Sequence, residues 1–569
     1  MKSRLSGILF AARVILLAAL STPGARAQTA SGASARRTVD LVLVNGRIHT
    51  VDPARPFATA LAIGNGKIVF AGSDIEARAL ARSGARVVDL GGKTVLPGLI
   101  DAHGHLLGLG RSLYTVQLAG VDSYEEVIRR VVDRARRAKP GEWIIGRGWD
   151  QTLWPGREFP THEALSRAVP SNPVVLTRID GHALLANAMA MRLAGVTGSV
   201  KDPDGGRIER LPDRSPSGVF VDNAKALVER RIPSETPEDK RRFLLAAATE
   251  VNRWGLVGVH DAGESRAAIE ELESIAREGR LPIRAYVMVA DDSASIAYYT
   301  ARGPRNGIYG GRIWVRSIKL YADGAVGSRG AALLEPYSDD PGNRGLLVSQ
   351  PAHLERVAEL ALRRGFQVSI HAIGDRGNRV ALDAFAAALK AVPRADHRFR
   401  IEHAQVLSPQ DIPRFAALGV IPSMQSSHQT SDMRWAEARL GPERVRGAYA
   451  WRSLLNTGVI IPNGTDFPVE QVNPFITFHS AVTRQDANNS PAGGWYPAEK
   501  MTREEALESM TIWPAFASFQ ESVTGSLTPG KYADFVILDR DIMTIPEEQI
   551  LSTRVLATYL GGKVVYQAK

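Results

Sequence analysis

The chain has 569 residues, 44% of them hydrophobic and 23% charged, so it is long enough for a large core and a smaller companion domain. Its formal net charge is +10, but Lys and Arg are dispersed and not clustered with aromatic residues, which argues against a nucleic-acid partner. The absence of cysteine excludes disulfides and thiolate metal ligands, so any metal must be held by histidine and carboxylate groups.

The first 27 residues have the pattern of an export signal peptide. Basic residues precede an apolar stretch over residues 8–20, and a small-x-small triplet occupies residues 25–27. Arg13 interrupts the apolar stretch, which is too short and too polar for a convincing membrane span. We therefore expect cleavage near Ala27, export to the periplasm or beyond, no stable membrane anchor, and a Ser/Ala-rich linker over residues 28–37.

Both ends of the remaining chain are predicted to be β-structure. Residues 38–98 are short β-branched runs separated by turn signals, including two Asn-Gly pairs typical of hairpins. The same texture returns over residues 525–569. The simplest arrangement joins the two segments into one composite β-sandwich, with the catalytic domain inserted between them.

Residues 99–524 alternate short apolar runs with helical patterns, which predicts parallel β/α units. Eight such runs end in polar or glycine-rich loops, and eight is the number that a (β/α)₈ TIM barrel requires. The runs are residues 94–105, 255–263, 282–289, 313–324, 366–375, 399–405, 419–425 and 459–468. The gap after the first run is too long for one helix, so we expect a capping insertion within about 110–250.

His103 and His105 directly follow the first apolar run, in the sequence DAHGH. Residues two apart in a strand face the same side, so both imidazoles can point at one metal ion. The alternative is a polar strand end with unrelated histidines, and the pair by itself leaves both interpretations open.

His371 and His403 end two successive later runs, and Asp466 follows the eighth. A single histidine at a strand end is more often a buried, hydrogen-bonded residue than a ligand. An aspartate in such a loop is more often a turn or helix-capping residue. Histidines at the ends of two neighbouring strands, however, favour a shared site at the mouth of the barrel.

Lys319 lies on a strand whose neighbours Ile318 and Leu320 face the opposite side, so its amine is predicted to point into the barrel. A cation among metal-binding groups would be repelled by the metal and costly to desolvate. A neutral amine that adds carbon dioxide would instead become an anionic carbamate able to bridge two metals. The alternative is a lysine that reaches the rim or pairs with Asp323, which the spacing alone favours.

Several motifs together resemble those of the amidohydrolase superfamily, specifically its amidohydrolase 3 group, which is YtcJ-like and related to N-substituted formamide deformylase. The motifs span nearly the whole chain in the order of that family. They are LPGLIDAHGH, WDQTLWPGRE, RIDGHALLAN, IKLYADGAVGSRGA, HAIGDRGN, RIEHAQ, NGTDFPVE and GSLTPGKYADFVILD. The resemblance implies a TIM barrel with a composite β-sandwich and the ligand set His103, His105, carboxylated Lys319, His371, His403 and Asp466.

From this resemblance we expect two divalent metal ions, zinc first and manganese or iron as alternatives. One metal would be held by His103, His105 and Asp466, the other by His371 and His403, with carboxylated Lys319 as the bridge. The expected reaction is hydrolysis of a non-peptide C–N bond, of the N-acyl or N-formyl type, by metal-activated water. Asp466 would act as general base and then as general acid.

His182, Trp154 and Arg329 are candidate substrate contacts, although all three can equally serve only packing or pairing. Rival functions in the same superfamily are a deaminase, a lactonase or a cyclic amidase, and a mononuclear deaminase would not need Lys319. A non-catalytic periplasmic binding protein is expected to lose metal ligands, and none is lost here. The partner is therefore expected to be a small-molecule substrate, with a homo-oligomer possible.

Overall fold

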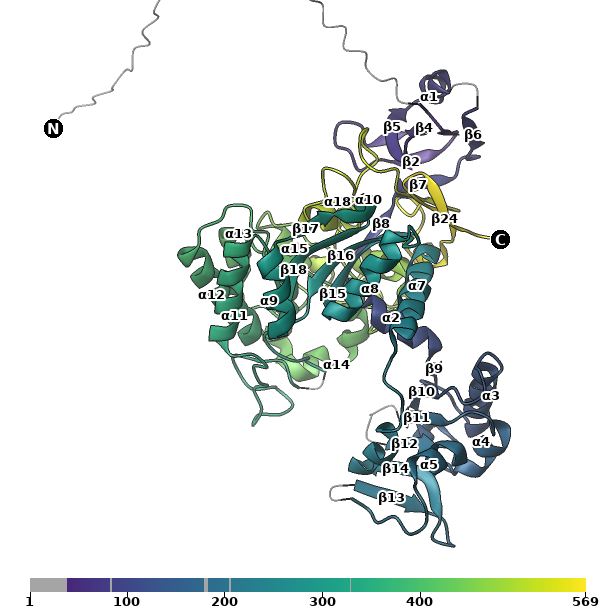
Figure 1. Cartoon of the computed structure of the whole chain (residues 1–569). Coiled ribbons are helices and arrows are strands. Elements are labelled where there is room, and N and C mark those ends of the chain that lie inside the picture. The colour runs from purple at the N-terminus through teal and green to yellow at the C-terminus, as the bar shows by residue number, and fades with distance from the viewer. Residues whose placement is uncertain (1–37, 82–83, 179–182, 204–205, 328) are drawn as a thin grey trace, which may run out of the picture.

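The structure is a computed structural model that describes residues 38–81, 84–178, 183–203, 206–327 and 329–569. The predicted signal peptide (1–27) and linker (28–37) lie outside the described residues. Figure 1 shows a central barrel, a β-unit at one end and a separate unit beside the other end. In the described part of the chain, no helix is both long and apolar enough to span a membrane.

The central domain is the predicted parallel barrel. Seven strands neighbour one another in chain order, and every pair is parallel. They are β8 (Leu99–Gly104), β15 (Leu256–Glu264), β16 (Arg284–Val289), β18 (Ile313–Tyr321), β19 (Gln367–Ala372), β20 (Arg400–His403) and β21 (Ile421–Ser423). The predicted barrel strands 2 to 7 therefore have direct counterparts, and the barrel mouth is formed where these strands end.

The eighth predicted run, residues 459–468, closes the barrel without forming a regular strand. On one side the Met424 amide donates to the Pro462 carbonyl at 3.0 Å. On the other side the amide of Ala102 donates to the carbonyl of Asn463 at 3.1 Å, and that of Asp466 donates to His103 at 2.7 Å. Pro462 has no N–H to give to a ladder, so the segment is fastened at separate points.

Helices cover the outside of the barrel, and α7 shows why they form where the sequence predicts. Thr236 and Asp239 make a reciprocal capping box, and Pro237 occupies the first turn. The apolar face of α7 then packs into the barrel core. The principal helices are α2 (Leu106–Tyr114), α7 (Pro237–Arg253), α8 (Arg266–Arg277), α9 (Ser293–Arg302), α11 (Pro351–Arg364), α12 (Asp375–Ala391), α13 (Ile412–Leu418), α14 (Ser426–Arg444) and α16 (Pro474–Thr483).

The β-unit is built from both ends of the chain, as predicted. One sheet has the order β5-β4-β1-β6, and the other has the order β24-β23-β22-β7-β2-β3. In the second sheet, β22 from the C-terminal part pairs antiparallel with β7 from the N-terminal part. The strands are β1 (Leu41–Val44), β2 (Arg47–His49), β3 (Phe57–Ala58), β4 (Ala60–Gly64), β5 (Lys67–Gly72), β6 (Arg86–Asp89), β7 (Thr94–Pro97), β22 (Phe535–Leu538), β23 (Val555–Leu560) and β24 (Lys563–Gln567).

The first predicted run, residues 94–105, forms two strands that belong to two different sheets. Residues 94–97 form β7 of the composite unit, whereas β8 enters the barrel. Gly98 separates them, and a Cβ atom there would lie 2.4 Å from the Val257 side chain. The close approach of the two sheets at this point therefore requires glycine.

The long gap after α2 holds a separate α/β unit, which we call the cap. Its sheet has the order β13-β14-β12-β11-β10-β9, and Figure 1 shows it projecting from the end of the barrel near α2 and α14. Its elements are β9 (Val116–Gln117), α3 (Tyr124–Ala135), β10 (Ile144–Trp149), α4 (His162–Ala168), β11 (Val174–Arg178), β12 (Ala183–Ala186), α5 (Ala188–Ala194), β13 (Gly206–Arg210), β14 (Pro216–Asp222) and α6 (Ala226–Glu229).

Candidate active site

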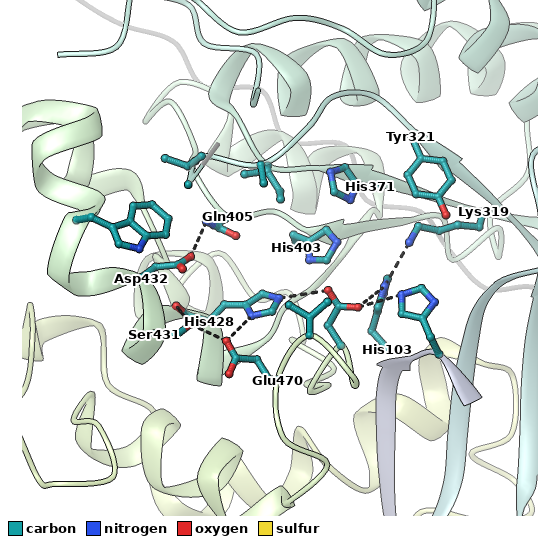
Figure 2. Close-up of a pocket in the computed structure, with 18 residues that line it drawn as sticks. His103, Lys319, Tyr321, His371, His403, Gln405, His428, Ser431, Asp432 and Glu470 are labelled. Carbon is teal, nitrogen blue, oxygen red and sulfur yellow. Dashed lines mark hydrogen bonds and ion pairs between the residues drawn. The ribbon is translucent and has the colours of Figure 1, made fainter. Parts of the chain in front are cut away.

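A cavity of about 410 Å³ lies at the carboxyl ends of the barrel strands, where TIM-barrel active sites are found. Figure 2 shows its side chains converging from several strand ends and from α14. All six residues predicted as metal ligands line it: His103, His105, Lys319, His371, His403 and Asp466. The structure thus brings together side chains that are spread over more than 360 positions of sequence.

His103, His105 and Asp466 form one candidate ligand group. Asp466 Oδ1 lies 3.0 Å from His105 Nε2 and 3.7 Å from His103 Nε2. The ligand atoms of the three residues all lie within 4.8 Å of one another. Burial acts to raise the pKa of Asp466, but hydrogen bonds to His105 and to a further histidine hold it well below its ordinary value. Its carboxylate is therefore anionic, as metal ligation requires.

His371 and His403 form the other side of the site, with ring centroids 4.5 Å apart. His371 Nε2 is buried without a hydrogen-bond partner. Burial and the neighbouring Lys319 lower the pKa of His371 to about 3, and burial lowers that of His403 as well. Both imidazoles are therefore neutral near pH 7, and an unpartnered buried nitrogen of this kind fits a metal ion.

Lys319 is buried between these groups, with only 1% of its surface exposed. Its Nζ lies 3.3 Å from His103 Nε2, and within the described part of the chain no ion pair joins it to a carboxylate. Asp323 instead accepts hydrogen bonds from the backbone of Ile373 and Gly374. Burial lowers the pKa of Lys319 to about 8, so a substantial fraction of the amine is neutral near that pH.

The backbone around the ligands is tied together and strained. Asp101 accepts hydrogen bonds from the amides of His103 and Thr465, at 3.0 and 3.1 Å, which fastens β8 to the eighth segment. His403 and Asp466 have φ angles of +74° and +57°, in a region that side-chain-bearing residues rarely adopt. Local strain of this kind is common at functional sites, where the surrounding structure holds it in place.

His428 is a site residue that the sequence predictions did not include. Its Nε2 lies 3.3 Å from Asp466 Oδ2 and its Nδ1 lies 3.2 Å from Glu470 Oε1. Burial acts to lower the pKa of His428, but the hydrogen bonds to both carboxylates outweigh it and raise the pKa to about 10. In the sequence, His428 could have been found from its position, because it lies three residues after the seventh apolar run and therefore at the mouth of the barrel.

Glu402 and Arg400 were also missed. Both are fully buried on β20, with Arg400 Nε 2.7 Å from Glu402 Oε1. Glu402 Oε2 pairs with His103 Nδ1, and Arg400 also donates a hydrogen bond to the Ala102 carbonyl. In the sequence, a charged residue in the middle of an apolar run gives no indication of which side chain it meets across a barrel.

The three predicted substrate contacts have different surroundings. Trp154 packs in the core of the cap, where its indole N–H donates to the Val121 carbonyl at 2.9 Å. Arg329 pairs with Asp339 at 3.0 Å. Neither lines the cavity, so their positions add no support to a role in substrate binding. His182 lies outside the described residues.

Similarity to known proteins, in sequence and in structure, covers nearly the whole chain. A family model described as "Amidohydrolase family" matches residues 86–566. Protein LONG AFTER FAR-RED 3 of Arabidopsis thaliana is 36% identical over 93% of this chain and 91% of its own. N-substituted formamide deformylase of Arthrobacter pascens is 28% identical over 93% and 98%. The crystal structure of an uncharacterized metal-dependent hydrolase from Pyrococcus horikoshii OT3 superposes with a TM-score of 0.74, at 31% identity over 89% of this chain and 99% of its own.

Proposed function

The chain belongs to the amidohydrolase family, and from this premise we propose that it is a metal-dependent enzyme that hydrolyses non-peptide C–N bonds of the N-acyl or N-formyl type. The similarity to a formamide deformylase along almost the full length of both chains supports the amide class. The substrate is expected to be a small molecule, because a cavity of about 410 Å³ suits one.

The observation that carries the proposal is the convergence of imidazole and carboxylate ligands on one side of the cavity. His103, His105 and Asp466 make one group, and His371 and His403 face it with pKa values lowered by burial. Bound divalent metals at such a site would lower the pKa of a water molecule and polarise the substrate carbonyl. Nitrogen and oxygen ligands suit zinc first, and manganese or iron next.

Asp466 is the residue best placed to carry the proton of the reaction. Its Oδ1 faces His103 and His105, while His428 holds its Oδ2. Water adds its oxygen to the amide carbon as the C–N bond breaks, and one water proton must reach the leaving nitrogen. We assign Asp466 to accept that proton and deliver it to the amine, first as a base and then as an acid.

Lys319 favours two metals over one. Its amine lies between the two histidine groups, is wholly enclosed, and has a pKa lowered by burial to about 8. The neutral amine can add carbon dioxide and release one proton, which gives an anionic carbamate able to act as a bridging ligand and avoids the cost of a buried ammonium group. A carboxylated Lys319 is thus the arrangement that accounts for a lysine in this position.

A deaminase, a lactonase or a cyclic amidase of the same family is the alternative. His403, His428 and Asp466 form a second group of possible ligands, which a site with one metal could use without Lys319. Metal content and turnover distinguish the two. Two metals per chain with hydrolysis of N-formyl or N-acyl amides would support the proposal. One metal per chain, with activity only on amino-heterocycles or lactones, would contradict it.

A further inference from the structure

One face of α14 forms the wall of the cavity that lies away from Lys319. His428, Ser431, Asp432 and Trp435 are spaced at i, i+3, i+4 and i+7, and all four line the cavity. Figure 2 shows His428, Ser431 and Asp432 on this side, with Glu470 beside them. The face of α14 that meets the cavity is therefore polar, so it is shaped for a ligand and not for packing.

Two carboxylates on this wall each have one oxygen committed and one without a partner. Asp432 Oδ2 accepts from the Tyr449 hydroxyl at 2.5 Å and from Gln405 Nε2 at 3.2 Å. Glu470 Oε1 accepts from His428 and from the Ser431 hydroxyl. No described residue donates to Asp432 Oδ1 or Glu470 Oε2. Two fixed acceptors with free oxygens thus border the same cavity.

The rest of the wall favours positive charge over negative. No arginine of the described chain lines the cavity, and its single lysine is Lys319, at the metal site. Beside the two carboxylates, the indole of Trp435 adds an aromatic surface that attracts cations. It packs against Gly327, where a Cβ atom would lie 3.3 Å from the ring. A carboxylate on the substrate would meet the free oxygens of Asp432 and Glu470, because both ring nitrogens of His428 are already paired with Asp466 and Glu470.

The position of Asp466 decides which part of a substrate reaches this wall. In the proposed function, on which this inference rests, Asp466 delivers a proton to the leaving amine. Its Oδ2 is turned toward His428, on α14. The amine portion of the substrate therefore extends from the scissile bond along α14, toward Asp432 and Trp435.

We infer that the natural substrate is an amide whose amine portion carries a second, positively charged group, bound by Asp432 and Glu470 over the face of Trp435. Asp432 is the specificity-determining residue, because Tyr449 and Gln405 hold its Oδ2 and so fix the position of the free Oδ1. N-acyl amino acids, whose amine portion carries a carboxylate, should be the poorest substrates for the same reason.

The test uses three formamides of similar length: monoformyl-cadaverine (cationic), N-hexylformamide (neutral) and N-formyl-aminocaproate (anionic). The metal-loaded enzyme should favour the cationic over the neutral compound by roughly 10-fold to 100-fold in kcat/KM, as expected for a charge-assisted hydrogen bond. The anionic compound should be the poorest of the three. Equal values for all three would overturn the inference.

Asp432→Asn is the decisive variant. Its amide oxygen can still accept from Tyr449 and Gln405, while its NH₂ group replaces the free anionic oxygen, so the local structure is retained. The preference for the cationic over the neutral compound should fall to about one, on the charge-pairing argument. Asp383→Asn, which neutralises a surface carboxylate paired with Arg414, should keep the preference. A preference that survives Asp432→Asn would contradict the role of this residue.

Failure of the proposed function gives a different result. If none of the three amides is hydrolysed, calorimetric titration of the same compounds into the metal-loaded protein measures their binding affinity for this wall directly. Tighter binding of monoformyl-cadaverine than of N-hexylformamide, lost in Asp432→Asn, would uphold the inference. Equal affinities would overturn it.

Discussion

Glu402 holds the imidazole of His103 from the side opposite the cavity, with His103 Nδ1 2.5 Å from Glu402 Oε2. The other ring nitrogen, Nε2, is thereby left facing Asp466 and Lys319, at 3.7 and 3.3 Å. A carboxylate behind a histidine fixes the ring orientation and makes its free nitrogen a better ligand. Arg400 in turn pairs with Glu402 and holds the pKa of this buried carboxyl well below its usual range, although burial acts to raise it.

We therefore predict that Glu402→Gln weakens metal binding by roughly 10-fold to 100-fold, the range seen when such outer partners are removed. Metal affinity, measured by competition with a chelator, is the readout. Glu273→Gln is the matched control, because it removes the charge of a similarly buried glutamate that pairs with Arg305 on the outside of the barrel. Equal metal affinities for both variants would show that Glu402 serves stability alone.

Much of the barrel could be predicted from the sequence because its signals are local. Strand period placed His103 in β8 and His105 one residue beyond its end on the same side, and it placed Lys319 inside the barrel. The eighth run was predicted to be a barrel strand, but it contacts its neighbours only at separate points, because Pro462 has no N–H for a ladder. The first run divides at Gly98, because a contact with Val257 that lies far away in the sequence decides that point.

The wider surroundings of the site could not be predicted, because they depend on contacts between distant parts of the chain. Glu402 and His103 are 299 residues apart, and nothing near either residue marks the other as its partner. His428 acquires its position from α14, whose polar face gives no amphipathic pattern to detect. Trp154 shows the reverse case, since a motif tryptophan is buried in the core of the cap.

His103→Ala and Asp466→Asn should each abolish turnover while leaving the fold largely intact. Both residues lie at the mouth of the barrel and not in its packed interior. Circular dichroism should remain close to wild type, while kcat/KM falls below detection. A near wild-type kcat/KM with full metal occupancy in either variant would refute the assignment.

The ion pair between Arg284 and Asp534 joins the barrel to the composite β-unit. Arg284 Nε lies 2.6 Å from Asp534 Oδ2, and both residues are almost fully buried. Asp534→Ala leaves a buried cation without its partner, so the folded state should lose about 3–5 kcal/mol. Thermal unfolding measures the loss. In the half-exposed pair of Arg111 with Glu235, Glu235→Ala should cost only about 0–1 kcal/mol.

The export signal remains a prediction from sequence alone. If residues 1–27 are removed during secretion, the mature protein should begin near Gln28. Mass spectrometry of protein recovered from the periplasm or medium gives the answer directly. Secreted protein with an intact Met1 would contradict the predicted cleavage.

Carboxylation of Lys319 should depend on pH, because only the uncharged amine reacts. Burial lowers its pKa to about 8, and only the uncharged amine adds carbon dioxide. The uncharged fraction grows as the pH rises through that value. At a fixed partial pressure of carbon dioxide, reconstitution of metal-free enzyme with zinc should therefore speed up between about pH 7 and about pH 9, and it should be slow in buffer depleted of carbon dioxide. Activity and bound metal, followed over time, provide the measurement.

Two variants at this position distinguish a lysine that binds metal from one that has only a structural role. Lys319→Ala should lose most bound metal and nearly all activity, and short carboxylic acids should restore part of both by supplying the missing anionic oxygens in the vacated space. Lys319→Met should lose metal as well but resist rescue, because its side chain fills the same space. Unaltered metal stoichiometry in Lys319→Ala, together with reconstitution that ignores bicarbonate, would show that Lys319 is no ligand. The site would then hold one metal, and the deaminase alternative would become the better account of the His403, His428 and Asp466 group.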